Sequence, residues 1–296
     1  MLNHQVNPIF VTGAPRSGTT LLRLLLTTHP GICIPPESLF FISLEKEYGN
    51  IGNLSNKIED FLNSLYDKSR FPKFCQWGVN RQALSRDLKR YNFLSYALAI
   101  NSVYQGYLQQ FAPTSLVWGD KNPCHIHQLE IIWKHFSSAR VVLILRDFRA
   151  CYSSLQAILS KELRAEKVWT GPRDLEGMAR QWDAVTKLVE KYRDCDQFFL
   201  IRYEELVANP SIELLKLCNW LGLDFDESML LFYQKNAELN LVLPSQAGLN
   251  PMTFKPIESA RIDAWRNELS AIEVENIELT NWRNLEKLGY KCVTQN

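Results

Sequence analysis

Residues 8–31, PIFVTGAPRSGTTLLRLLLTTHPG, decide the fold class. A short apolar run at 9–11 meets a loop with Gly13 and Gly18, and the loop opens directly into a leucine-rich segment. This order predicts a strand, a phosphate-binding loop and a helix, because backbone N–H groups and the helix N-terminus then converge on an anion. Thr19 stands where a Walker loop has its lysine. The stretch therefore predicts a loop that holds a phosphate without the residue that serves nucleoside triphosphate hydrolysis.

The loop also contains its own charge and hydroxyl groups. Arg16 and Ser17 lie within it, and Thr19 and Thr20 follow Gly18 in the first turn of the predicted helix. Glycine lets the backbone approach a phosphate closely, so we expect these five residues to bind the anion. The alternative is a plain glycine turn between a strand and a helix, and the agreement of the strand, the loop residues and the helix favours the anion site.

Composition excludes several classes of protein. The chain has 296 residues, 46% of them hydrophobic, which is enough for a sizeable core in one domain. Its formal net charge of +1 argues against general affinity for nucleic acid or membranes. Seven scattered cysteines without a CxxC pattern favour reduced thiols. With neither a signal peptide nor an apolar run of membrane length in the sequence, we expect a cytoplasmic protein without a membrane span.

Strand and helix patterns alternate along the chain. Further apolar runs with strand character lie at 31–34, 116–118, 141–145 and 198–201. Helical periodicity is strongest at 19–27, 126–136, 175–192, 212–221 and 272–288. Residues 40–112 are mainly helical in pattern and form an insertion beside the sheet. The sequence predicts an α/β, P-loop-like three-layer fold with a central, mostly parallel sheet flanked by helices.

The stretch GAPRSGTTLLRLLLTTHP closely resembles the 5′-phosphosulfate loop of sulfotransferases that use PAPS (3′-phosphoadenosine 5′-phosphosulfate). Its arginine is similar to that of the bacterial and tyrosylprotein branch, whereas the cytosolic branch typically has lysine. The resemblance implies a single sulfotransferase domain over 1–296, with the insertion on the acceptor side. It implies sulfuryl transfer from PAPS to a hydroxyl or an amine, release of PAP (the 3′,5′-bisphosphate product), no metal, and a catalytic role for Arg16.

Two other functions remain as alternatives. A P-loop kinase-like phosphotransferase is disfavoured because the Walker lysine and a clear acidic magnesium motif are missing from the sequence. A noncatalytic nucleotide-binding protein is disfavoured because the residues that the family uses for donor binding and transfer are all present.

VVLILRDFRACYSSL, residues 141–155, supplies a second anion site. Its apolar run ends at Arg146, at a strand end where ligands of open α/β sheets bind, and Ser154 follows eight positions later. Sulfotransferases show this pair at the same spacing, so the resemblance implies 3′-phosphate binding by Arg146 and Ser154. The alternative pairs Arg146 with Asp147 or a neighbouring acid. Arg149 remains open between a donor contact and a solvent-facing residue.

Two residues are candidates for the transfer step. Glu37 follows Pro35, Pro36 and the second apolar strand, and a glutamate at this place is the general base in the tyrosylprotein and related bacterial branch. A favourable acid at a helix N-terminus is the alternative for Glu37. Lys121 matches the family lysine that reaches the bridging oxygen and the sulfuryl group. The histidine base of the cytosolic branch falls at Pro123 here, which supports Glu37.

The pair His125 and His127 invites a zinc interpretation. On a helix, an HxH spacing points the rings to nearly opposite sides, and no third ligand cluster is evident, so we expect no metal. His125 also remains an alternative base because it follows Lys121 closely.

Further donor contacts are implied by the resemblance. Tyr203, in FFLIRYEELVANP, matches a strand-end tyrosine near the nucleotide, with a core or capping role as the alternative. Lys255 and Arg261 lie in a Lys-Pro…Trp segment similar to one that folds over the nucleotide in the tyrosylprotein branch. A catalytic serine of that branch has no counterpart here, and Asn250 lies near its place.

The acceptor is the least defined part of the prediction. A small molecule, a glycan or a peptide are all compatible, and no sequence feature indicates an oligomeric state. The segments 70–78 and 167–174 contain aromatic residues that either line an acceptor site or belong to the core: Phe71, Phe74, Trp77 and Trp169.

Overall fold

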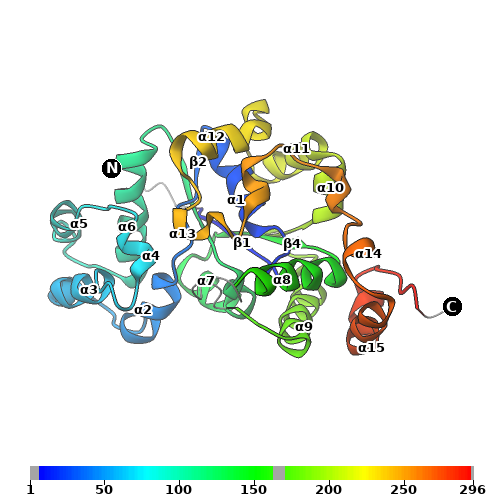
Figure 1. Ribbon diagram of the computed structural model, residues 1–296. Coiled ribbons are helices and arrows are strands. Elements are labelled where there is room, and N and C mark those ends of the chain that lie inside the picture. The colour runs from blue at the N-terminus through cyan, green and yellow to red at the C-terminus, as the bar shows by residue number, and fades with distance from the viewer. Residues whose placement is uncertain (1–6, 163–170, 295–296) are drawn as a thin grey trace.

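A five-stranded parallel sheet forms the centre of the molecule (Figure 1). The computed structural model describes residues 7–162 and 171–294. The strands lie in the order β2-β3-β1-β4-β5, and each pairing is parallel. Their bounds are β1 Ile9–Thr12, β2 Ile32–Cys33, β3 Val117–Lys121, β4 Arg140–Leu145 and β5 Phe198–Arg202. The predicted α/β sheet is confirmed, and all of its described strands are parallel.

Helices cover both faces of the sheet (Figure 1). One face is covered by α1 Thr19–Thr28, α10 Tyr203–Ala208, α11 Pro210–Leu221 and α12 Phe232–Leu239. The other is covered by α7 Leu129–His135, α8 Phe148–Glu162 and α9 Leu175–Tyr192, and α15 Ala271–Lys287 packs against α8 and α9. The short elements of the C-terminal third are η3 Glu227–Leu231, α13 Pro244–Ala247, η4 Pro251–Phe254, η5 Ser259–Arg261 and α14 Trp265–Glu268.

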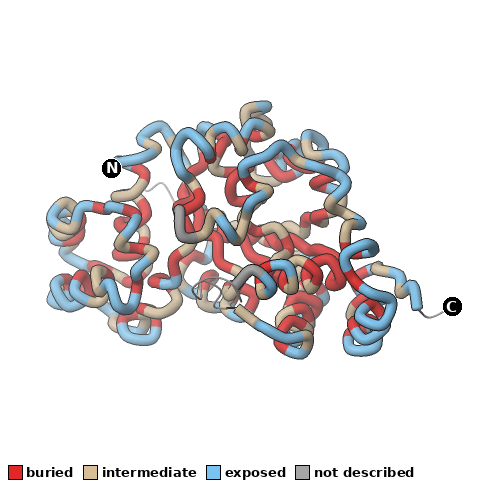
Figure 2. Tube along the Cα trace, viewed as in Figure 1, coloured by how far each residue is buried: buried red, intermediate tan, exposed pale blue. Residues whose placement is uncertain are grey.

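The insertion is helical, as predicted, and lies at one end of the sheet (Figure 1). It consists of α2 Phe40–Tyr48, η1 Ser55–Lys57, α3 Ile58–Leu65, α4 Pro72–Cys75, α5 Arg81–Leu88 and α6 Tyr96–Phe111. Its inner positions are buried together with those of the sheet, whereas its outer positions are exposed (Figure 2).

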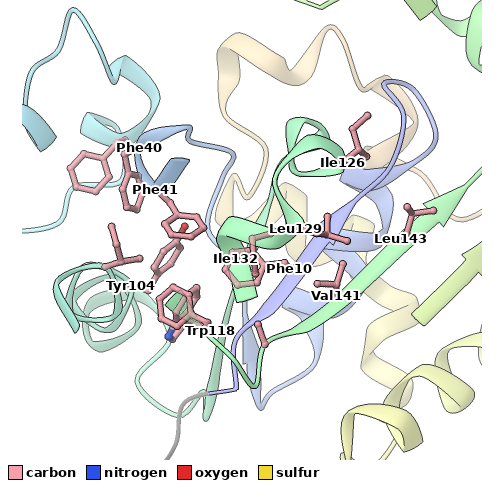
Figure 3. Close-up of a cluster of buried hydrophobic side chains, with 14 of the residues drawn as sticks. Phe10, Phe40, Phe41, Tyr104, Trp118, Ile126, Leu129, Ile132, Val141 and Leu143 are labelled. Carbon is pink, nitrogen blue, oxygen red and sulfur yellow. The ribbon is translucent and has the colours of Figure 1, made fainter. Parts of the chain in front are cut away.

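Burial on both faces explains the near-continuous apolar strands. Along β4, Val141 and Leu143 pack into the core shared with the insertion, whereas Val142 and Ile144 pack into the core beneath α1. A strand covered on both sides needs apolar residues at consecutive positions, which is the pattern that predicted this parallel sheet. Figure 3 shows Val141 and Leu143 on the same side of the sheet as Phe10 and Trp118.

Aromatic packing joins the insertion to the sheet. The rings of Tyr104 on α6 and Trp118 on β3 stack with their centroids 4.1 Å apart (Figure 3). Phe74 and Trp77 are 1% and 3% exposed, and the Phe40 ring lies 5.1 Å and 5.5 Å from theirs. Residues 70–78 therefore place their aromatic side chains in the core, Phe71 included, and do not line an acceptor site with them. Trp169 lies outside the described residues, as does most of 167–174.

Two predicted boundaries were wrong. The strand predicted at 116–118 continues to Lys121, because Gly119 and Asp120 pair with Ile9 and Phe10 of β1 despite their low hydrophobicity. The helix predicted at 126–136 is divided into η2, Pro123–His127, and α7. The first correction matters for the site, because it makes Lys121 the last residue of a strand next to β1.

Candidate functional site

Most of the residues singled out above gather at the carboxyl ends of the strands. Two adjoining cavities open there and share Arg16, Thr19, Thr20 and Asn250 as lining residues. The larger cavity also meets Gly18, Arg146, Ser154, Tyr203 and Arg261. The smaller cavity also meets Glu37, Lys121 and Lys73, which is a residue of the insertion. Sequence positions from all five strand ends are thus brought to one place.

The glycine loop is shaped by close approach and by positive φ angles. Gly18 has φ +106° and immediately precedes α1, and Arg16 has φ +69°. A Cβ atom at Gly13 would lie 2.4 Å from the carbonyl oxygen of Ile144 on β4. The buried hydroxyl of Ser17 finds no hydrogen-bond partner among the described residues. A glycine cradle with an unpaired hydroxyl at a helix N-terminus fits an oxyanion.

Replacing Gly13 by alanine is expected to lower the free energy of unfolding by about 2 kcal/mol or more, because β4 or the loop must move to admit the methyl group. Urea unfolding measures the loss. The matched control is Gly52→Ala, since Gly52 is exposed and an added Cβ there meets no atom within 4 Å. Equal stability of the two variants would contradict this description of the loop.

Arg16 connects the loop to α8 and to the C-terminal segment. Its Nε donates to Ser154 Oγ at 3.2 Å, its Nη2 to the carbonyl of Leu249 at 2.9 Å, and its Nη1 to Asn250 Oδ1 at 3.4 Å. Burial, and then the charge of nearby Arg146, lower the pKa of Arg16 to about 10. Arg16 therefore stays charged at neutral pH and sits beside a second cation, an arrangement that a bound anion would relieve.

Arg146 has donor capacity left. Its guanidinium carbon lies 4.1 Å from the centre of the Tyr203 ring, and its Nη1 donates to the Arg16 carbonyl at 3.1 Å. The buried Nε has no hydrogen-bond partner among the described residues. Asp147 accepts a hydrogen bond from Arg149, Nη2 to Oδ2 at 2.6 Å, so this predicted alternative partner of Arg146 pairs with another residue.

Arg149 lines neither of these two cavities and does not face solvent. It is 3% exposed, and it bonds to Asp147 and, at 2.5 Å, to Glu278 on α15. Its guanidinium also lies 4.2 Å from the centre of the Trp265 ring. Arg149 therefore connects the start of α8 to the C-terminal helices, and the predicted solvent-facing alternative was wrong.

Glu37 is held between two lysines. Its Oε2 accepts from Lys121 Nζ at 2.7 Å, and its Oε1 accepts from Lys73 Nζ at 3.0 Å. Burial raises the pKa of Glu37, but the charges and hydrogen bonds of Lys121 and Lys73 outweigh it and hold the pKa at about 2. Glu37 is thus ionised at neutral pH and lines the smaller cavity. It makes no capping hydrogen bond to α2. Lys73 was not among the predicted residues, because no local pattern links it to Glu37.

The histidines do not form the site. His125 is 1% exposed, and its Nε2 lies 3.0 Å from Asp120 Oδ2. His127 bonds to Gln181. Across the two described ranges, no group of three or more His, Cys, Asp or Glu side chains is placed to hold a metal ion. His125 is a buried, paired residue rather than a cavity base.

The C-terminal segment covers the larger cavity. Asn250 and Arg261 are among its lining residues, and Arg261 also pairs with Glu268 at 3.0 Å. Lys255 is exposed and is placed outside that lining. The contact of Asn250 with Arg16 joins this segment to the glycine loop. The sequence had placed Asn250 only near the position of the catalytic serine of the tyrosylprotein branch.

Among the helices described, none combines the length and the apolar composition needed to cross a lipid bilayer.

Comparisons with known proteins identify the family and the fold. A model of the sulfotransferase family matches residues 8–227. Nodulation protein NoeE of Sinorhizobium fredii is 26% identical over 98% of this chain and 68% of its own length. Protein-tyrosine sulfotransferase 1 of Danio rerio is 22% identical over 97% of this chain and 73% of its own. The sulfotransferase domain of the Synechococcus PCC 7002 olefin synthase has a TM-score of 0.61 at 20% identity, covering 98% of both chains, and so shares the fold.

Proposed function

This chain belongs to the sulfotransferase family, and from that premise we propose that it transfers the sulfuryl group of PAPS to a hydroxyl or amine acceptor, with Glu37 as general base. The observation that carries the proposal is the pair Arg16 and Arg146. Their guanidinium groups lie at the carboxyl end of the sheet, beside a helix N-terminus, and the Nε of Arg146 is buried without a partner among the described residues. Such a cluster suits a ligand that is anionic at two places.

The residues divide between the two ends of the donor. The loop, with Arg16, Ser17, Gly18, Thr19 and Thr20, would hold the 5′-phosphosulfate. Arg146 and Ser154 would hold the 3′-phosphate, and Tyr203 would support Arg146 through the ring contact described above. Lys255 remains a predicted contact that lies outside the lining.

PAPS, when bound, supplies the activated sulfuryl group. Glu37 would accept the proton of the acceptor, and Lys121 and Arg16 would stabilise the negative charge that develops on the leaving oxygen. With a pKa of about 2, Glu37 is a weak base while both lysines contact it. For Glu37 to act as a base, Lys121 would have to leave Glu37 and contact the leaving oxygen of the donor. The pKa of Glu37 would then rise, and its carboxylate would become a stronger base.

We place the acceptor in the smaller cavity. Lys73 of the insertion lines it, which supports the assignment of 40–112 to the acceptor side of one domain. Because the name of the Danio rerio relative specifies protein tyrosine, tyrosine peptides belong in an acceptor screen beside glycans and small hydroxyl compounds.

Equilibrium binding of radiolabelled PAPS tests the donor assignment. We expect saturable binding without magnesium, competed by PAP and not by ATP at equal concentration. Binding of Mg-ATP with no binding of PAPS would instead favour a kinase-like phosphotransferase.

A further inference from the structure

Glu37 has a separate lysine on each carboxylate oxygen. Lys121 on β3 is 5% exposed in its side chain, and Lys73 on α4 is 36% exposed. The Glu37 side chain between them is 20% exposed. The more buried lysine belongs to the sheet, and the more accessible one belongs to the insertion.

Core packing fixes the position of Lys73. It lies between the buried residues Phe71 and Phe74. The Phe74 ring lies 5.1 Å from that of Phe40, only three residues after Glu37. The contact that packs α4 against α2 therefore also places Lys73 beside Glu37. The aromatic segment 70–78 contributes one cation to the site while its rings remain in the core.

Other titratable groups around Glu37 have different tasks. Arg23 on α1 directs its hydrogen bonds to the carbonyls of Ile34 and Leu241 rather than to Glu37. Burial raises the pKa of the Cys124 thiol, on η2, to about 12, which keeps the thiol neutral.

A further cation near Glu37 comes from the glycine loop. Arg16 shares the smaller cavity but directs its donors to Ser154, Leu249 and Asn250. Among the described residues, Lys73 and Lys121 are thus the cations that hydrogen-bond to the Glu37 carboxylate.

We propose that Lys73 is a positioning residue that keeps Glu37 ionised and oriented when Lys121 turns to the donor. This inference rests on the proposed function for its catalytic meaning. A partly buried carboxylate that loses all of its cations tends to become neutral, and a neutral carboxyl cannot accept a proton. With Lys73 retained, Glu37 stays ionised and is a stronger base than it is under both lysines.

A site-resolved titration tests the role of Lys73. Protein labelled with ¹³C at the glutamate side-chain carboxyl carbon is titrated by NMR with saturating PAP, and the Glu37 signal is assigned by its absence in Glu37→Gln. We expect Lys73→Met to raise the pKa of Glu37 by about 1 unit or more, because an opposite charge in contact has been removed. Lys73→Arg should restore a low pKa.

The matched control is Lys68→Met, which removes the same charge from an exposed position nearby in the insertion. An unchanged pKa of Glu37 in Lys73→Met, or an equal rise in Lys68→Met, would overturn the proposal. If Lys73→Met lost the binding of labelled PAP while Lys68→Met kept it, the proposal would also be overturned, in favour of a role of Lys73 in folding. Failure of the wild-type protein to bind PAP would instead count against the proposed function, and the titration without PAP would still report the contact of Lys73 with Glu37.

Discussion

Glu37→Gln is expected to lower the rate of sulfuryl transfer by about 10²- to 10⁴-fold, while PAPS binds as tightly as to the wild type or tighter. Glutamine keeps the size and hydrogen-bonding capacity of the side chain, but it cannot take the acceptor proton. The substitution also releases Lys121 from its 2.7 Å ion pair, which adds available positive charge for an anionic donor. Initial rates of ³⁵S transfer from labelled PAPS, and equilibrium binding of the same compound, measure the two effects separately.

The matched control for this variant is Glu47→Gln, which changes a partly exposed glutamate paired with Arg70 on the insertion. We expect it to leave both rate and binding unchanged. Turnover by Glu37→Gln at a rate close to that of the wild type would remove Glu37 as the base, and the proton acceptor would then have to be a different group.

Arg16→Ala and Arg146→Ala are each expected to weaken PAP binding by about 10- to 100-fold, because each removes charge-assisted hydrogen bonds to a phosphate. Adenosine 5′-monophosphate, which lacks the 3′-phosphate, separates the two arginines. Arg16→Ala should weaken binding of both nucleotides, since Arg16 is assigned to the 5′ end. Arg146→Ala should weaken binding of PAP and leave that of the monophosphate much less changed.

Calorimetric titration of both nucleotides gives these affinities. The control is Arg180→Ala, because Arg180 is 71% exposed in its side chain and pairs only loosely, at 3.7 Å, with Glu176. Equal losses for the two nucleotides in Arg146→Ala would contradict the 3′-phosphate assignment. Arg146 also donates to the Arg16 carbonyl, so the double variant should lose less than the sum of the two single effects.

Features that depend on a local sequence pattern could be predicted from the sequence. Continuous apolar runs revealed the parallel strands, because both faces of the sheet are buried. Gly13, Arg16 and Gly18 predicted the loop, because its conformation depends on glycines at fixed places. Arg146 was found because it ends an apolar strand.

Other features depended on contacts between distant segments. The strand β3 reaches Lys121 because its backbone pairs with β1, although apolar character ends at Trp118. Lys73 reaches Glu37 through packing of Phe74 against Phe40, and Asn250 reaches Arg16 from 234 residues away. Such contacts leave no periodicity or spacing in the sequence, so these two contacts could not be predicted from it.

Transfer by the wild-type protein itself is the most direct test of the proposed activity. Labelled PAPS is incubated with a panel of tyrosine peptides, glycans and small hydroxyl and amine compounds, without added metal, and products are identified by mass spectrometry. We expect an acceptor that gains one SO₃ group, with one PAP formed for each sulfated product. The same panel is incubated in parallel with Mg-ATP. Phosphorylated acceptor in that incubation, with PAPS left intact across the whole panel in the first, would contradict this expectation.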